Sequence, residues 1–187
     1  RPAWRESVAP LLAEASAILD VLATTAAPAA YAELARAALP AAIEDREGTA
    51  VLAHAVQALS RISDAAAVDL PAAAGLSLQI ALTDLERHGP SPMADRLLDR
   101  VCRECGPVPE LRAEAFFGMA RAALGRGDFE TARQYAEMSA DMRRRAAPGA
   151  LPLTDGLRAE IEHGCGNHVV ARDLAIEVLR DAALART

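Results

Sequence analysis

The residues in this sequence best suited to chemistry are its cysteines and histidines. Cys102 and Cys105 form a C-x-x-C pair in "CRECG", and "HGCGNH" supplies His163, Cys165 and His168. Thiolate and imidazole groups at such short spacings are typical ligands of tetrahedral zinc. A redox role for the C-x-x-C pair would require a βαβ context. The sequence therefore raises a zinc-site hypothesis, which depends on whether the fold brings the two motifs together.

Other catalytic patterns are absent from the sequence. "HGCGNHV" contains a G-x-G, but no strand precedes it and no third glycine follows, so it is not a nucleotide fingerprint. Neither G-x-S-x-G nor H-E-x-x-H occurs, and all 20 basic residues are arginine, which excludes a Walker lysine and a Schiff-base lysine. Carboxylate pairs such as Glu160 with Glu162 are ordinary on a charged helix face. We expect no enzymatic activity and no cofactor.

The elements that position these residues are predicted to be helices. The 187 residues are 52% hydrophobic but only 3% aromatic, and alanine, leucine, arginine and glutamate dominate. These are the strongest helix formers, whereas β-branched and aromatic clusters are sparse. The composition predicts an all-α protein in which small side chains let helices approach closely.

An internal repeat organises the helices. A glycine followed five residues later by an alanine recurs at intervals of 41, 38 and 39 residues. In "GRGDFETARQY" we expect Gly127 to end one helix in a left-handed conformation, Asp128 to cap the next helix, and Ala132 to let the two helices touch. The glycine–alanine pairs are Gly48 and Ala53, Gly89 and Ala94, Gly127 and Ala132, and Gly166 and Ala171.

Each unit is thus predicted to be a helical hairpin, and the chain a single domain over 1–187. An amphipathic helix over 6–25 precedes the hairpins, Pro40 interrupts a helix, and "DLPAAAG", "CGPVPE" and "AAPGALPLT" are predicted inter-hairpin loops. The units are 30–64, 72–105, 111–146 and 152–187.

The hairpin pattern argues against zinc. Cys102 and Cys105 follow a second helix, whereas Cys165 and its histidines occupy a turn between helices, and a helix of about 14 residues separates such edges by roughly 20 Å. We therefore expect no metal, a buried Cys102 and a loop Cys105. The triplet Arg143 to Arg145 ends a helix, and we interpret its charges as solvated and as compensating the helix dipole rather than as a phosphate site.

These features resemble the tetratricopeptide repeat family. The resemblance covers residues 30–187 and is strongest over 113–146, although the glycine spacings of 41, 38 and 39 residues exceed the family period of about 34 residues. It competes with another α-hairpin solenoid or a plain bundle. The positions that carry it are Phe116, Met119, Ala120, Gly127, Asp128, Phe129, Ala132, Tyr135 and Ser139.

The resemblance implies a concave groove, lined by the first helices, that binds an extended peptide or a partner helix. Phe116 and Phe117 are adjacent and cannot both enter one hairpin core, so either one is an exposed anchor or stacking buries both. The partner-binding positions carried over from the family are Gln79, Thr83, Glu86, Glu114, Phe117, Arg121, Leu124, Glu160 and His163.

Charge and cysteine content limit the partners and the compartment. The net charge of −6 disfavours nucleic acid, no segment is apolar enough to enter a membrane, and three cysteines do not form a secreted disulfide framework. We expect a cytoplasmic scaffold that binds a protein or peptide. Because the chain begins with Arg1, we expect a fragment of a longer protein or a processed product. The alternative function is the ligand-sensing or oligomerising part of a transcriptional regulator, and an uncapped final helix would favour a homo-oligomer.

Overall fold

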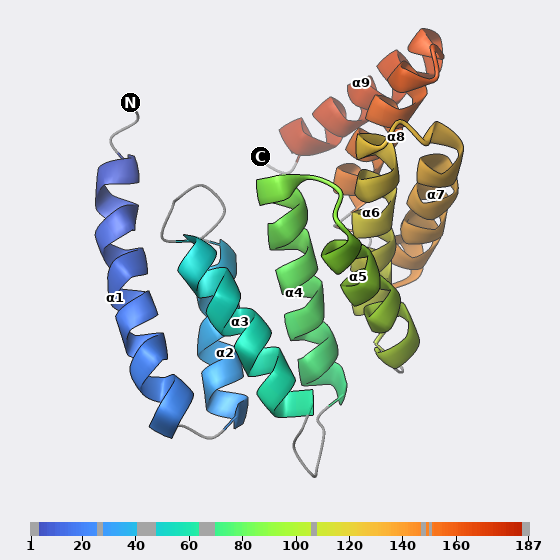
Figure 1. The fold of residues 1–187 in the computed structure, drawn as a ribbon. Coiled ribbons are helices and arrows are strands. Elements are labelled where there is room, and N and C mark those ends of the chain that lie inside the picture. The colour runs from blue at the N-terminus through green and yellow to red at the C-terminus, as the bar shows by residue number, and fades with distance from the viewer. Residues whose placement is uncertain are drawn as a thin grey trace. The chain divides into compact units, whose positions relative to one another are not determined.

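The computed structural model describes residues 4–25, 28–40, 48–63, 70–105, 108–146, 149 and 151–184. All the regular elements in these residues are helical, which confirms the predicted all-α class (Figure 1). The helices are α1 (Trp4–Thr25), α2 (Pro28–Ala38), α3 (Gly48–Ser63), α4 (Leu70–His88), α5 (Pro92–Glu104), α6 (Pro109–Gly125), α7 (Phe129–Ala146), α8 (Leu151–Gly164) and α9 (His168–Leu184).

The chain divides into two compact units. Unit 1 spans Arg1–Arg100 and unit 2 spans Val101–Thr187, so the division falls within α5. The single domain over 1–187 stays a prediction. None of the described helices is both long enough and apolar enough to span a membrane.

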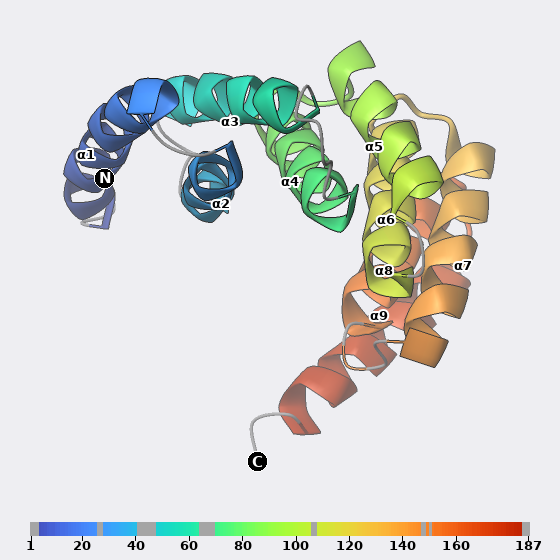
Figure 2. The same cartoon turned by 90° about the horizontal axis from the view of Figure 1, so that it is seen from below.

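Unit 1 has a core of aliphatic residues. Helix α3 packs against α1, α2 and α4, and it lies between α1 and α4 in both views (Figure 2). Tyr31, Leu39 and Leu76 are fully buried in this core, and Met93 and Leu97 of α5 pack against it. Helix α2 ends at Ala38, before Pro40, as the sequence predicted.

Unit 2 is built from two helical hairpins, α6–α7 and α8–α9. Helix α8 packs against α7 and, less extensively, α6, while the described part of α9 packs on α8 alone (Figure 2). The core contains Ala120, Ala132 and Ala136 from the first hairpin with Leu157 and Ile161 from α8. Small residues on one hairpin therefore form a seam that receives large aliphatic side chains from the next helix.

The predicted glycine turns are confirmed in three of the four units. Gly89, Gly127 and Gly166 have φ of 75°, 76° and 82°. At the turn before α7, Asp128 Oδ1 accepts a hydrogen bond from the Thr131 N–H at 3.1 Å, and Ala132 is fully buried. Hydrogen bonds from Thr131, chiefly from its side chain and then from its backbone, lower the pKa of Asp128.

The first unit does not follow the glycine–alanine pattern, which corrects the sequence alignment. Gly48 is the first residue of α3 rather than a left-handed turn residue. Ala53 is exposed, whereas Ala55, two residues later, is fully buried. A glycine can begin a helix as well as end one, so its presence alone does not fix the register of the following face.

Two predicted loops are also corrected. Helix α4 begins at Leu70 and α8 at Leu151, so most of "DLPAAAG" and the end of "AAPGALPLT" are helical. Pro71 and Pro152 each occupy the second position of their helix. Proline is tolerated in a first helical turn because its missing N–H would have no intrahelical acceptor there.

Gly127→Ala is expected to lower the free energy of unfolding by about 1 kcal/mol, because an alanine strains at positive φ. No atom lies within 4 Å of a Cβ built at Gly127, so this cost is conformational rather than steric. Gly156→Ala is the matched control. Gly156 is helical, with equally open space, and alanine there is expected to stabilise by about 0.5–1 kcal/mol. Urea unfolding followed by circular dichroism measures the change in the free energy of unfolding for both variants. A change of the same sign in both would contradict the left-handed turn conformation of Gly127.

Candidate functional site

The predicted groove residues of α6 contact a buried arginine. The guanidinium of Arg143 lies 4.9 Å above the centre of the Phe117 ring, and its Nη2 is 2.7 Å from Glu114 Oε1. Arg143 is 1% exposed. The sequence interpretation of Arg143 as a solvated end charge is therefore wrong. Antiparallel packing of α6 and α7 places it over the first half of α6, where the aromatic ring and the carboxylate compensate its charge.

The two adjacent phenylalanines are both half-buried. Phe116 stacks on Tyr135 of α7, with ring centres 6.1 Å apart and planes 19° apart. Phe117 packs against the core of unit 2. Neither ring is an exposed anchor, so the alternative in which packing buries both describes the structure better.

The remaining predicted positions of unit 2 lie on α6 and α8. Arg121 and Leu124 are half-buried, and Leu124 packs against the same core as Phe117. Glu160 and His163 are exposed on α8. Among the predicted partner-binding residues of unit 2, the exposed ones are thus the two on the α8–α9 hairpin.

The predicted positions on α4 belong to unit 1. Gln79 is half-buried and Glu86 is exposed. Thr83 is 1% exposed, so its side chain is out of reach of a partner docking on this structure. The sequence pattern placed Thr83 on a helix face but carried no information on what covers that face.

An open pocket of about 380 Å³ lies on the α8–α9 hairpin. It is lined by Ala159, Ala171 and Ala175 together with Glu160 and His163. The lining is mostly apolar, and alanine side chains leave room for a large side chain from outside the hairpin. This pocket brings together the two exposed predicted residues of unit 2.

His163 and His168 also line this pocket. Their rings are 5.0 Å apart, with the two Nδ1 atoms separated by 3.2 Å. Both side chains are exposed. The α8–α9 turn thus places two imidazoles close together in the lining of the pocket. The H-x4-H spacing around Gly166 could have indicated this arrangement.

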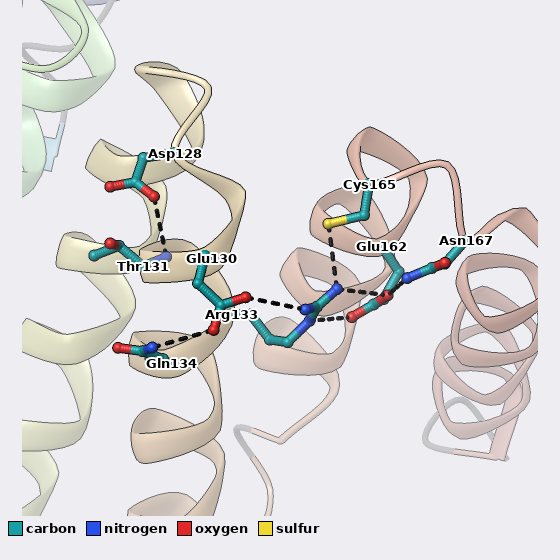
Figure 3. Close-up of polar contacts among 8 residues, drawn as sticks. All are labelled: Asp128, Glu130, Thr131, Arg133, Gln134, Glu162, Cys165 and Asn167. Atoms are coloured by element: carbon teal, nitrogen blue, oxygen red, sulfur yellow. Dashed lines mark hydrogen bonds and ion pairs between the residues drawn. The ribbon is translucent and has the colours of Figure 1, made fainter.

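A polar network joins α7 to the α8–α9 turn (Figure 3). Arg133 donates to both carboxylate oxygens of Glu162, at 2.8 and 3.2 Å, and to Cys165 Sγ at 3.2 Å. Asn167 donates to Glu162 Oε2 at 2.6 Å, and Glu130 lies 3.4 Å from Arg133. The bidentate pair fixes the rotation of α8 against α7, because two parallel hydrogen bonds define both distance and orientation.

Glu162→Gln is expected to lose stability at neutral pH and to be less sensitive to acid than the parent. Hydrogen bonds from Arg133 and then from Asn167 hold the pKa of Glu162 below its ordinary value of 4.5. Because the folded-state pKa is the lower one, this stabilisation is complete above pH 4.5 and is lost as pH falls through the folded pKa. Urea unfolding between pH 3 and pH 7 should show the two proteins converging below pH 4.5. A constant difference across that range would contradict a stabilising carboxylate.

The cysteines differ from their predicted environments. Cys105 follows α5 in a non-helical segment, as predicted, but it is fully buried; Cys102 is half-buried rather than buried, and Cys165 is exposed. Within the part of the chain that the structure describes, no three histidine, cysteine or acidic residues are grouped to hold a metal. Cys105 is the first residue after α5, and the local sequence did not indicate that its side chain is buried there.

Two hydrogen-bonded constellations in unit 1 were not anticipated. The Tyr31 hydroxyl lies 2.9 Å from His54 Nδ1 and donates to Gln57 Oε1 at 3.1 Å, and His54 Nε2 is 3.4 Å from Asp20. Burial raises the pKa of Tyr31, so the phenol is not activated as a nucleophile. The arrangement is best explained as a satisfied polar core.

Ser91, Asp84 and His88 form the second constellation. Asp84 lies in the middle, accepting from the Ser91 hydroxyl and contacting His88 Nδ1 at 2.7 Å. A nucleophilic serine would need the histidine beside it as a base. Ser91 Oγ instead accepts from the Ala94 N–H at 3.0 Å and caps α5, so these residues terminate and start helices.

Comparison with protein-family models, with curated proteins and with solved structures found no match to this chain. Functional inference therefore rests on the geometry of the chain itself.

Proposed function

We propose that this protein is a helical-repeat scaffold that binds a partner polypeptide. The observation that carries the proposal is the open, mostly apolar pocket on the α8–α9 hairpin, which is lined by three alanines together with Glu160 and His163. The positions of Glu160 and His163 in the repeat had led us to expect that both residues contact a partner. A mostly apolar surface with charged groups at its margin is the arrangement found in the centre of protein interfaces.

The surrounding surface supports a macromolecular partner. Leu179 of α9 is 69% exposed, and Ile176, three residues before it on the same side of the helix, is also exposed. Contiguous exposed apolar surface is rare on monomeric proteins and marks interaction sites. The pocket is too open to enclose a small molecule, which would bury most of its surface on binding.

The hairpin repeat supports a tetratricopeptide-like stack as the architecture of the scaffold. Three hairpins share a left-handed glycine turn, and in each of them the alanine five residues later is buried. In such a stack each hairpin presents a face to the helix that packs on it.

Photo-crosslinking tests this proposal. A p-benzoylphenylalanine at position 163 should form an adduct with a polypeptide from an extract of the source organism. The matched control carries the label at position 144, an exposed site on α7 away from the pocket. The adduct partner, identified by mass spectrometry and purified, should then bind the unlabelled protein directly. Equal adducts at both positions, or none at 163, would overturn the proposal.

A specific observation also favours self-association, the second candidate function. Val169 and Ile176 occupy the positions on α9 that Glu130 and Glu137 occupy on α7, counting the 39 residues between their turn glycines. Aliphatic residues thus replace two exposed carboxylates on the outer face. Sedimentation equilibrium of the parent and of a Val169→Glu, Ile176→Glu variant tests it: a parent dimer that the variant disperses supports an oligomerising domain, and a monomeric parent excludes it.

A further inference from the structure

The first hairpin of unit 2 shows how one of its faces is filled. Ala120, Ala132 and Ala136 form an apolar seam between α6 and α7, and Leu157 and Ile161 of α8 are buried against it. The two large side chains are four residues apart, so they extend from one face of α8. A helix with an aliphatic pair at this spacing is therefore the natural occupant of an alanine seam in this protein.

The second hairpin repeats the seam without an occupant among the described residues. The 39 residues between Gly127 and Gly166 relate Ala120, Ala132 and Ala136 to Ala159, Ala171 and Ala175. The last three alanines line the open pocket. The relation continues along α9, because exposed Leu179 corresponds to buried Ala140.

The arginine beside the seam also has an equivalent in the second hairpin. Arg133 corresponds to Arg172, which lines the pocket, is 66% exposed and donates to the adjacent Asp173 at 2.8 Å. In the first hairpin the equivalent arginine binds Glu162, which directly follows Ile161. A helix bound in the second seam would place a carboxylate at the same position to pair with Arg172.

A close contact at Gly164 sets a steric requirement for such a helix. A Cβ at Gly164, the last residue of α8, would overlap the ring of Phe129 at the start of α7. The residue that corresponds to Phe129 is His168, which lines the open pocket. An occupant in the same register therefore needs a small residue two positions after its acid, where it crosses His168.

We infer that the α8–α9 seam binds an amphipathic helix of a partner protein that carries two aliphatic residues four apart, a glutamate directly after the second, and a small residue two positions later. This inference rests on the proposed polypeptide-binding function and specifies its partner. A second copy of this chain does not supply the helix from α8, because its Leu157 and Ile161 are already buried against its α6–α7 hairpin. Charge complementarity with Arg172 distinguishes this partner from an apolar helix of any sequence.

The sequence of α8 itself provides the probe. A peptide of residues 151–164, blocked at both ends and held helical by a lactam bridge between positions 156 and 160, is titrated into the full chain by calorimetry. The bridge is needed because an isolated 14-residue helix is marginal in water. The expected result is saturable binding at one site per chain. Truncating both aliphatic residues of the peptide to alanine should abolish it.

A charge-reversal cycle tests the register. Arg172→Glu in the protein is expected to weaken binding of the parent peptide at least about tenfold, and a peptide with Glu162→Arg should restore it. Ala175→Trp, which fills the seam at an exposed position, should abolish binding of both peptides. Circular dichroism of each variant confirms that it is folded before titration.

Three results would overturn the inference. Binding that persists unchanged in both protein variants would place the peptide elsewhere. Absence of peptide binding while the position-163 adduct still forms would leave the polypeptide-binding function intact but reject this helix as its partner. A dimer of the chain alone that Ala175→Trp converts to monomer would assign the seam to a second copy.

Discussion

Ile161→Ala is expected to lower the free energy of unfolding by about 3 kcal/mol. Ile161 is 1% exposed and packs against the alanine seam formed by Ala120, Ala132 and Ala136. Truncation removes its transfer free energy and leaves a cavity that alanine neighbours cannot fill, so the cost falls within the 2–5 kcal/mol range of buried isoleucine truncations. Urea unfolding monitored by circular dichroism gives the change in free energy. Hydrogen exchange of α8 peptides shows whether the loss is located in unit 2.

Ile176→Ala is the matched control for this prediction. The same truncation on α9 removes a side chain that is 39% exposed, and its expected cost is at most about 0.5 kcal/mol. Comparable losses for the two variants would mean that α9 is covered in solution, and would count against an open face on this hairpin.

Glu114→Ala is expected to cost about 2 kcal/mol, although the sequence pattern gave this glutamate a partner-binding role. Its carboxylate lies 2.7 Å from Nη2 of Arg143, which is almost fully buried. Removing one partner of a fully buried ion pair costs about 3–5 kcal/mol. The lower expected value reflects the position of Glu114, which is 38% exposed, so that water can partly solvate the remaining charge. Chemical unfolding of the purified variant measures the loss.

Glu160→Ala provides the comparison, because the sequence assigned both glutamates the same role. Glu160 is exposed and lines the open pocket, and its truncation should change the free energy of unfolding by no more than about 0.5 kcal/mol. Glu160→Ala should instead weaken binding of the crosslinked partner. If Glu114→Ala proved as neutral as Glu160→Ala, Arg143 would not depend on the carboxylate of Glu114.

The order of the helices could be predicted from the sequence because their signals are local. Apolar spacing marks an amphipathic helix, a glycine at positive φ ends one, and a side chain such as Asp128 or Ser91 caps the next. Each signal involves residues within a few positions of one another. Three of the four predicted glycine turns were therefore located correctly, whereas Gly48 begins a helix.

Helix starts near proline were less predictable. Proline breaks a helix from the fifth position onward but fits its first turn, so "DLPAAAG" and "AAPGALPLT" are compatible with either a loop or a helix start. The structure shows that Leu70 and Leu151 begin helices. Which alternative forms depends on the packing of the following turns, as the sequence pattern alone does not distinguish them.

Only the tertiary structure determined which charged and polar residues are buried. Arg143 belongs to an arginine triplet at a helix end, and its two neighbours are exposed. Its burial depends on Glu114 and Phe117, more than 25 residues earlier, which antiparallel packing places beside it. Thr83 and Cys105 are buried for the same kind of reason, since local sequence does not encode contacts between distant segments.

The candidate site likewise combines features that the sequence determined with features that only the tertiary structure decided. The sequence by itself determined that Glu160, His163 and the alanine at position 171 share a hairpin, because repeat spacing and helical periodicity are properties of the chain. Only the tertiary structure showed that α8 fills the seam of the first hairpin while the equivalent seam on α8–α9 stays open. The physical reason is that a repeated pattern specifies a face capable of packing, whereas its occupancy depends on which helix reaches it in three dimensions.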